Sequence, residues 1–153
     1  DRVTGAGDAT TFNSAEGVLY AEINPTQRHT ASRYVGLSNG TTSNRVIMGV
    51  TANTSTVTCF VSSGGATQAI LSSAIVISDF SKVAVRYKNN DFSLFVNGVK
   101  IVTDTSGLAP VGLNQLAYGN GVPNVTPFTG KVKALAVFNE ALTDSELECL
   151  TKI

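Results

Sequence analysis

Two pairs of glutamates, Glu16 with Glu22 and Glu146 with Glu148, lie close enough in the sequence to be considered for glycoside hydrolysis. Retaining glycoside hydrolysis needs two carboxyl groups about 5–5.5 Å apart on one face, one as nucleophile and one as general acid. Glu16 and Glu22 would share a face only if one unbroken strand held both. Glu146 and Glu148 fall in a predicted helix at a spacing that directs them apart. We interpret all four as solvated or capping carboxylates, and we expect no enzymatic activity.

Nucleophilic and metal chemistry also lack the residues that they need. His29 is the only histidine. The one Gly-x-Ser-x-Gly run, residues 36–40, lies between two predicted strands, so it is not the strand-to-helix elbow that exposes a nucleophilic serine. Cys59 and Cys149 lie far apart and form no Cys-x-x-Cys pair of the kind that binds zinc. We predict that both cysteines are small buried hydrophobic residues, and a disulfide between them remains the alternative. The glycine-rich segment 5–8 neither follows a strand nor opens a helix, so it is no phosphate-binding loop.

The remaining chemistry is ligand recognition by polar and aromatic side chains. Tyrosine offers a flat apolar face with a hydroxyl, and asparagine or arginine can hold sugar hydroxyls through paired hydrogen bonds. The alternative for the tyrosines is a half-buried place in a strand, and for Asn120 and Asn124 it is turn formation. The candidate ligand-binding residues are Arg33, Tyr34, Asn44, Arg45, Tyr118, Asn120 and Asn124.

Composition narrows the class of partner. The 153 residues fit one domain, 14% of them are charged, and the formal net charge is zero. No electrostatic field therefore exists to attract nucleic acid or an anionic membrane. The longest apolar runs have the length of strands, well short of the roughly 18 residues that a membrane span needs. We expect neither a nucleic-acid partner nor membrane insertion.

Short alternating apolar runs, separated by turn residues, must position the candidate residues. Such runs at intervals of about 8–12 residues are typical of a β-sandwich or barrel. Residues 1–11 lack this periodicity and are predicted to be a linker or N-terminal arm, which leaves residues 12–153 as one sandwich domain. The predicted strands cover residues 17–23, 33–37, 44–51, 55–61, 66–71, 81–88, 91–96, 99–103, 113–119 and 129–139.

The strongest local signal is a three-stranded meander between residues 83 and 101. Asn97-Gly98, set between alternating apolar residues, is typical of a two-residue hairpin, and Asn89-Asn90 can form the other turn. Alternation then assigns the two faces of the first strand. The predicted core-facing residues are Val83, Val85 and Tyr87, and the predicted solvent-facing residues are Lys82, Ala84, Arg86 and Lys88.

The end of the chain predicts a strand followed by a short helix. Val132, Leu135 and Val137 are the apolar residues of this strand that we expect to face the core. Val132 is at an even position and the other two are at odd positions, so the alternation must shift by one residue, which predicts a β-bulge near residues 133–134. Thr143 and Glu146 have the spacing of a capping box. The helix is expected over residues 144–150, docked on the sandwich because so short a helix is unstable alone.

These two C-terminal segments together resemble the concanavalin A-like, laminin-G-type jelly-roll domains. That family has an apolar-Ala-apolar-x-Tyr strand that leads through a turn to a strand ending in Asn-Gly, and residues 83–87 and 96–98 match it. Its terminal pattern, a strand beginning Gly-Lys and later Leu-Thr-x-x-Glu, matches residues 130–147. The resemblance implies an all-β fold, an antiparallel β-sandwich of the concanavalin A-like jelly-roll type with one short C-terminal helix. The aromatic residue that usually precedes the first strand, often tryptophan, is represented here by Phe80.

The resemblance also bears on metal binding and catalysis. Laminin-G-type domains often bind calcium at a loop edge, and Asp79, Asp91 and Asp104 each lie beside a predicted turn. No Asp-x-Asp-x-Asp loop accompanies them, so we predict no metal and no cofactor, with calcium as the alternative. Hydrolytic relatives carry carboxylates at alternate positions of one strand, and this chain has no such run.

Three further segments, residues 11–22, 39–47 and 144–151, resemble more narrowly the version of this fold in bacteriophage tail fibres, tail spikes and other virion appendages. That resemblance implies a non-catalytic domain at the virion surface, part of a homotrimer, that attaches to a host-cell glycan or other envelope component. One alternative is a structural decoration domain that makes only protein contacts. Another is a laminin-G-like adhesion module of a secreted protein, which predicts a Cys59–Cys149 disulfide and glycans on the Asn-x-Ser/Thr triplets at Asn39, Asn53 and Asn124.

Overall fold

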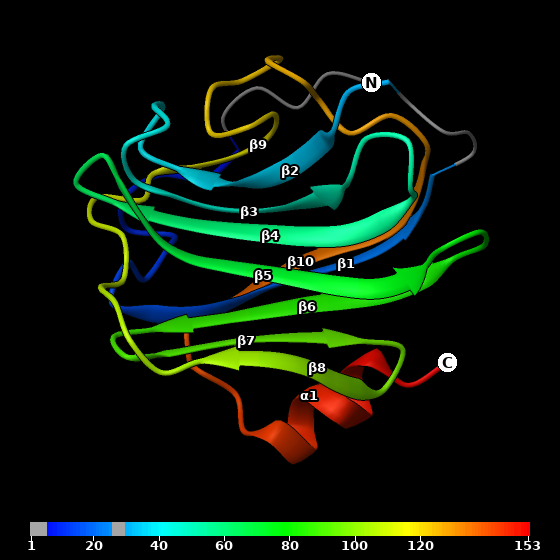
Figure 1. Cartoon of the computed structure of the whole chain (residues 1–153). Coiled ribbons are helices and arrows are strands. Elements are labelled where there is room, and N and C mark those ends of the chain that lie inside the picture. Colours follow the sequence, from blue (N-terminus) through cyan, green and yellow to red (C-terminus); the bar gives the residue numbers. More distant parts are fainter. Residues whose placement is uncertain (1–5, 26–29) are drawn as a thin grey trace.

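The chain folds into two antiparallel five-stranded sheets packed face to face, with one helix at the C-terminal end (Figure 1). The computed structural model describes residues 6–25 and 30–153. We call the sheet of order β5-β4-β3-β2-β9 the front sheet and the sheet of order β10-β1-β6-β7-β8 the back sheet. The predicted all-β sandwich with one short helix is confirmed. The elements are β1 Glu16–Asn24, β2 Arg33–Ser38, β3 Arg45–Val50, β4 Thr56–Ser63, β5 Ala66–Val76, β6 Ser81–Lys88, β7 Asp91–Val96, β8 Val99–Asp104, β9 Gln115–Tyr118, β10 Lys131–Phe138 and α1 Asp144–Thr151.

The predicted meander forms β6, β7 and β8 of the back sheet. Asn97 and Gly98 have φ angles of 51° and 81°, the positive values that a primed hairpin turn requires. Asn90 in the preceding turn has φ 58°, a conformation that asparagine tolerates better than most residues. The Asn97 side chain also accepts a hydrogen bond from the Lys82 backbone N–H at 2.9 Å, which fixes the turn against β6.

The last strand contains the predicted bulge. Glu22 of β1 is opposite Ala134 and Ile23 is opposite Val132, so Lys133 is left without a partner residue in the ladder. The extra residue switches the strand's parity, and Val132, Leu135 and Val137 all pack against the core between the sheets. The freed Lys133 side chain forms an ion pair with Glu22 at 3.0 Å.

The main core lies between the two sheets and is built from alternate residues of nearly every strand. Val83, Val85 and Tyr87 belong to it, as predicted. Tyr87 keeps its hydroxyl satisfied by donating to the Asn13 carbonyl oxygen at 2.7 Å, and burial raises the pKa of this phenol. The front sheet contributes Val35, Leu37, Val46, Met48, Val50, Val57, Cys59, Val61, Ala69 and Leu71.

The outer face of the back sheet carries a second apolar cluster, where the helix docks on the sandwich as predicted. Leu147 of α1 packs there with Val18, Tyr20, Ala84 and Phe95. The expectation that the outward residues of β6 face solvent is wrong for Ala84, which is fully buried, and for Arg86, which is 8% exposed. The alternation was assigned correctly, but the helix covers this face. No helix among the described residues is long and apolar enough to cross a membrane.

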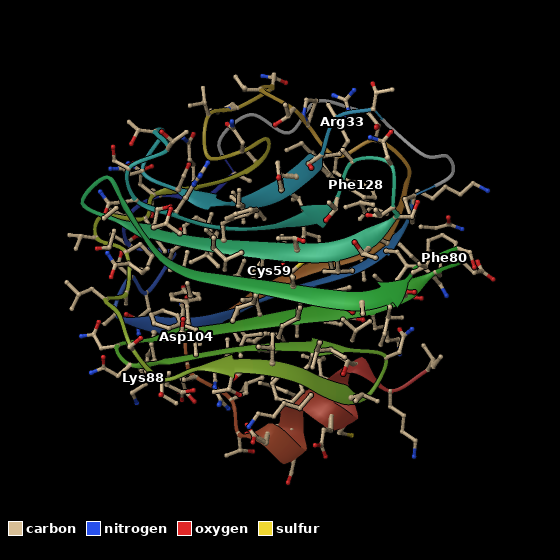
Figure 2. The ribbon with its side chains drawn as sticks, viewed as in Figure 1. Arg33, Cys59, Phe80, Lys88, Asp104 and Phe128 are labelled. Carbon is tan, nitrogen blue, oxygen red and sulfur yellow. The ribbon has the colours of Figure 1, made fainter. Side chains whose placement is uncertain are left out.

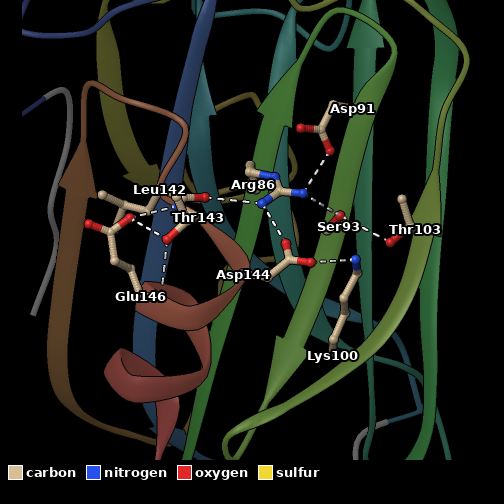
Figure 3. A network of polar contacts seen from close by, with 9 residues as sticks. All are labelled: Arg86, Asp91, Ser93, Lys100, Thr103, Leu142, Thr143, Asp144 and Glu146. Carbon is tan, nitrogen blue, oxygen red and sulfur yellow. Dashed lines mark hydrogen bonds and ion pairs between the residues drawn. The ribbon is translucent and has the colours of Figure 1, made fainter.

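The helix begins with the predicted capping box. The Thr143 side chain accepts from the Glu146 backbone N–H at 3.4 Å, and the Thr143 N–H donates to the Glu146 carboxylate at 2.7 Å. Arg86 then ties the first turn to the back sheet, since its guanidinium contacts both the Leu142 carbonyl and the Asp144 carboxylate (Figure 3). The start of the helix is therefore fixed both by its own cap and by the sheet below it.

The two cysteines are free and have different surroundings. Cys59 faces the core from the middle of β4 (Figure 2), and burial raises the pKa of its thiol. Cys149 is exposed on α1, so the prediction that both are buried is wrong for this residue. The disulfide alternative is wrong as well, because one thiol points between the sheets and the other lies on the far side of the back sheet.

The N-terminal segment lies along the front sheet. Ala6 exchanges two backbone hydrogen bonds with Leu116 of β9, at 3.1 and 2.9 Å. The Asp8 carboxylate accepts hydrogen bonds from Thr10 and Thr11, which lower the pKa of Asp8 to about 2 and close a local turn. The domain boundary at residues 11 and 12 stays a prediction.

Candidate functional site

The outer face of the front sheet brings together three of the predicted ligand-binding residues. Val35 and Leu37 of β2 point into the core, so Tyr34 points outward. Arg45 points outward at the start of the neighbouring β3. Asn120, in the loop after β9, contacts Arg45 through its carbonyl oxygen. We call Tyr34, Arg45 and Asn120, together with Phe60 and Ser62 of β4, the front-face site.

An aromatic pair forms one half of this site. The rings of Tyr34 and Phe60 have their centroids 6.0 Å apart and meet edge to face at 81°. The two residues belong to β2 and β4, so the pair spans β3 between them. It can do so because Gly49 of β3 is opposite Tyr34 and has no side chain to keep the ring away. The half-buried rings offer an apolar surface of the kind on which sugar rings stack.

Arg45 forms the other half. Its Nε lies 3.3 Å from Ser62 Oγ, and its Nη1 donates to the Asn120 carbonyl oxygen. Partial burial lowers the pKa of Arg45, while the Tyr34 phenol acts in the opposite direction. No acidic side chain of the described residues pairs with Arg45. The guanidinium is thus oriented by neutral oxygen atoms, and no carboxylate of the described residues neutralises its charge.

The loop of residues 119–128 holds this arrangement in place. The Tyr34 backbone donates to the Thr126 carbonyl at 3.0 Å and accepts from the Phe128 N–H at 2.7 Å. Further along β2, the Ser38 hydroxyl donates to the Gly121 carbonyl at 2.6 Å. The loop is therefore fixed at both ends of β2, which places Asn120 beside Arg45.

Charge is distributed unequally between the two sheets. The five strands of the front sheet contain two charged residues, Arg33 and Arg45, and both are cationic. The back sheet strands contain charges of both signs, several of them joined in ion pairs. A negatively charged ligand that approaches the front face therefore meets no carboxylate from its strands.

Tyr118 and Asn124 lie apart from the front-face site, around a hollow of about 460 Å³ at one end of the sandwich. Tyr118 points to the inner side of β9, and burial raises the pKa of its phenol. The described residues that line the hollow are uncharged: Tyr118, Asn124, Pro127, Phe128, Thr129, Gly130 and Val132. The structure thus separates Tyr118 and Asn124 from the front-face site.

The remaining two predicted residues do not join the site. Arg33 is opposite Val50 at the other end of the β2–β3 ladder from Arg45, and its buried Nε has no hydrogen-bond partner. Asn44 directly precedes Arg45, but its side-chain oxygen accepts from the Gly64 and Val111 backbone N–H groups. These bonds hold loops together, so Asn44 is a structural residue.

The glutamates considered as hydrolytic pairs lie away from the front-face site. Glu16 and Glu22 lie on one unbroken strand, β1, but they form ion pairs with Lys88 and Lys133. Six residues of a strand separate them by roughly 20 Å, about four times the distance that retaining hydrolysis needs. Glu146 caps α1. His29 lies outside the described residues.

The three aspartates considered as calcium ligands, Asp79, Asp91 and Asp104, form hydrogen bonds or ion pairs with other residues of the domain. Asp91 pairs with Arg86 at 2.8 Å, Asp79 accepts from Asn24 and from its neighbour Phe80, and Asp104 accepts from Ser106. Within the described residues no three acidic, histidine or cysteine side chains gather in a way that could hold a metal ion.

Sequence reasoning missed Phe60 and Ser62. Both lie on β4, and neither neighbours a candidate residue in the sequence. They join the site because β3 pairs Arg45 with Ser62 and Ile47 with Phe60. The alternation of β4 indicates that Phe60 and Ser62 share a face, but only the strand register shows which residues lie beside them.

A family model for the concanavalin A-like lectin/glucanases superfamily matches residues 4–148. The chain belongs to this superfamily. Similar solved structures include the carbohydrate-binding module CBM40 of the Ruminococcus gnavus intramolecular trans-sialidase, bound to α2,3-sialyllactose. It is 20% identical with a TM-score of 0.77, over 100% of this chain and 96% of that one.

Two other solved structures share the fold. The leech intramolecular trans-sialidase is 17% identical with a TM-score of 0.76, over 99% of this chain and 26% of that one. A pentraxin from Limulus polyphemus is 15% identical with a TM-score of 0.68, over 99% of this chain and 74% of that one. At these identities the likeness establishes the fold. No curated protein sequence matches the chain.

Proposed function

We propose that this domain binds glycans without cleaving them, and that it does so at the front-face site. The observation that carries the proposal is the aromatic pair Tyr34–Phe60 beside Arg45, on a sheet whose strands contain no acidic residue. An aromatic ring can stack on the apolar face of a sugar, while an oriented guanidinium binds a carboxylate through two parallel hydrogen bonds.

We infer that the glycan is acidic. Arg45 is half-buried and has no carboxylate partner among the described residues, so an anionic sugar would supply the missing charge. The CBM40 module of similar fold, whose structure contains sialyllactose, supports this choice of ligand class. A neutral sugar could stack on the rings but would leave the cation without a counter-charge.

The absence of hydrolysis is part of the proposal. Glu16 and Glu22 are tied into ion pairs on the back sheet, and the described strands of the front sheet bring no carboxylate to the bound sugar. Retaining and inverting hydrolysis both need two carboxyl groups beside the scissile bond. A ligand held at Tyr34 and Arg45 would therefore remain intact.

We further propose that the domain is carried by a bacteriophage tail fibre or spike at the virion surface, where it attaches to a host glycan. The segments at residues 11–22, 39–47 and 144–151 support this placement. A homotrimeric fibre would present three sites and raise avidity by ~10²–10⁴ through effective concentration. Weak binding at each site would then suffice.

An array of acidic and neutral glycans, followed by calorimetric titration of the hits, tests the proposal. We expect binding to acidic glycans, and Arg45→Gln should reduce it at least tenfold. Arg33→Gln is the matched control, since it removes the other cation of the same sheet, which alternation along β2 places on the inner side with Val35 and Leu37. Tyr34→Ala should also reduce binding, whereas Tyr118→Ala, in the separate hollow, should leave it unchanged.

Three results would overturn the proposal. Failure to bind any glycan or host-envelope extract would favour a structural decoration domain that makes only protein contacts. Equal losses for Arg45→Gln and Arg33→Gln would exclude the front-face site. Release of free sugar from a bound glycan would show that the domain is an enzyme.

A further inference from the structure

Three asparagines of this chain are followed directly by glycine: Asn39, Asn97 and Asn120. In such a step the backbone nitrogen of the glycine can attack the side-chain amide carbon of the asparagine, because glycine has no side chain to hinder the approach. A new C–N bond closes a cyclic imide, the bond to the side-chain nitrogen breaks, and ammonia leaves with the proton of the glycine N–H. Water then opens the imide to a carboxylate, so the reaction needs no oxidant and no other reagent.

Two of the three steps have a hydrogen bond on the attacking nitrogen. The Gly40 N–H donates to Ser38 Oγ at 3.1 Å, and the Gly98 N–H donates to Thr151 Oγ1 at 3.1 Å. The glycine nitrogen becomes a nucleophile when it loses its proton, and an acceptor that holds the neutral N–H opposes this loss. These two steps are therefore protected by the fold.

The Asn120-Gly121 step differs from both. The Gly121 N–H donates to no acceptor among the described residues. Arg45 Nη1 donates to the Asn120 carbonyl oxygen, which belongs to the same peptide group as the Gly121 nitrogen. A cation at that oxygen stabilises the negative charge that the peptide group acquires when the nitrogen loses its proton. The Val122 N–H donates to Asn120 Oδ1 at 3.3 Å, so it stabilises the charge that this oxygen gains during the attack.

We propose that Asn120 is a site of spontaneous deamidation, and that Arg45 of the front-face site promotes the reaction. When water attacks the imide at the former main-chain carbonyl, the chain continues through the side chain of residue 120, and that carbonyl group becomes a free carboxylate. Its oxygen is the atom that Arg45 contacts before the reaction. This product, isoaspartate, therefore has its negative charge at the guanidinium. When water attacks the other carbonyl of the imide, the product is an ordinary aspartate at the same position.

The consequence for binding rests on the proposed function. A carboxylate paired with Arg45 would satisfy the guanidinium from within the protein, in the place of the carboxylate of an acidic glycan. The added negative charge would also repel an anionic ligand at short range. Deamidation at Asn120 should thus reduce the binding of acidic glycans, while the sheets that carry the site stay folded.

Peptide mapping by mass spectrometry after incubation at pH 8 and 37 °C tests the modification directly. We expect Asn120 to react at least tenfold faster than Asn39 and Asn97, which serve as internal standards in the same molecule. Arg45→Gln removes the cation from the peptide group and should slow the reaction at Asn120 at least threefold. Arg33→Gln, the matched control, should leave all three rates unchanged. Unchanged rates at Asn39 and Asn97 in Arg45→Gln show that this variant keeps its fold.

Equal rates at the three asparagines would overturn the proposal, as would a faster reaction at Asn120 in Arg45→Gln. The effect on binding is measured by titrating fresh protein and its deamidated fraction, separated by anion exchange, with the acidic glycan that binds best on the array. We expect an affinity at least tenfold lower for the deamidated fraction. Asn120→Gln closes such a ring far more slowly, so its own affinity should not change on incubation.

The two readouts separate this inference from the proposed function. If Asn120 reacts selectively but the fresh protein binds no acidic glycan, only the proposed function fails. If the fresh protein binds and Asn120 reacts no faster than Asn39 and Asn97, only the deamidation site fails. Equal affinities of the fresh and deamidated forms would show that the inferred loss of binding is wrong.

Discussion

Nη1 of Arg86 lies 2.7 Å from Oδ1 of Asp144, and this contact joins the back sheet to the C-terminal helix (Figure 3). The Arg86 side chain is 10% exposed, whereas that of Asp144 is 44% exposed. A buried guanidinium costs free energy unless carboxylates or carbonyls satisfy it, and Asp91 supplies a second partner at 2.8 Å. The helix is thus attached by charge as well as by the apolar contact of Leu147.

Asp144→Asn should destabilise the domain. The change leaves Arg86 with one carboxylate instead of two and removes the partner of Lys100. We expect the free energy of unfolding to fall by about 1–2 kcal/mol, less than for a fully buried pair because Asp144 is half exposed. Chemical denaturation measures it. Asp104→Asn, which alters only local bonds to Ser106, is the control and should change stability little; equal losses would contradict the assignment.

Acid should weaken the same attachment. A hydrogen bond from Lys100, and then one from Arg86, hold the pKa of Asp144 below its ordinary value of 3.8. Because the folded pKa is lower than the unfolded one, the contribution is complete above the ordinary value and is lost as the pH falls through the lowered value. Melting temperatures measured from pH 7 to 2 should therefore fall more steeply for the native chain than for Asp144→Asn. Parallel curves would show that Asp144 contributes nothing to the acid sensitivity.

The two thiols should react very differently with iodoacetamide. Cys149 is exposed on α1, while Cys59 is fully buried and its thiol pKa is raised by that burial. The thiolate is the reactive form, so the folded protein at pH 8 should gain one adduct, on Cys149. In denaturant it should gain two, as counted by mass spectrometry. Rapid labelling of Cys59 in the folded protein would contradict its place in the core.

Local features of this chain were predictable because the residues that form them are close in sequence. The Thr143–Glu146 capping box spans four residues, and Asn97-Gly98 makes its turn from two. Even the bulge at Lys133 follows from the change of parity within one strand. In each case the signal depends on backbone geometry alone and needs no knowledge of neighbouring strands.

The front-face site depends on strand neighbours that are distant in sequence. Arg45 meets Ser62 through the β3–β4 register and Asn120 through the return of the chain after β9. The residue types were sufficient to select Arg45 and Asn120, but spacing along the chain does not reveal that β2 lies between β3 and β9. Tyr118 was grouped with them for its type, although its inward orientation places it at the separate hollow.

The burial of Ala84 and Arg86 shows the same limit. Alternation along β6 predicts that both point away from the main core, and they do. What covers that face depends on the docking of α1, about 60 residues further along the chain. A pattern of alternate residues specifies orientation, whereas burial is decided by tertiary packing.

Gly49 should be indispensable for the aromatic pair. A methyl group at this position would collide with the backbone oxygen of Arg33 and would lie 2.6 Å from Cδ1 of Tyr34. Gly49→Ala must therefore push β2 away from β3 or turn the Tyr34 ring out of its contact with Phe60. We expect the free energy of unfolding to fall by about 1–3 kcal/mol, the usual cost of overpacking. Denaturant unfolding measures the loss.

Gly64→Asn provides the contrast to this change. Gly64 has φ +60°, which asparagine tolerates, and nothing lies within 4 Å of an added Cβ, so stability should change by no more than about 0.5 kcal/mol. Gly49→Ala should in addition weaken the binding of acidic glycans, because Tyr34 is displaced while Arg45 keeps its own bonds to Ser62 and Asn120. An unchanged affinity in a destabilised Gly49→Ala protein would separate the aromatic pair from ligand binding and leave recognition to Arg45.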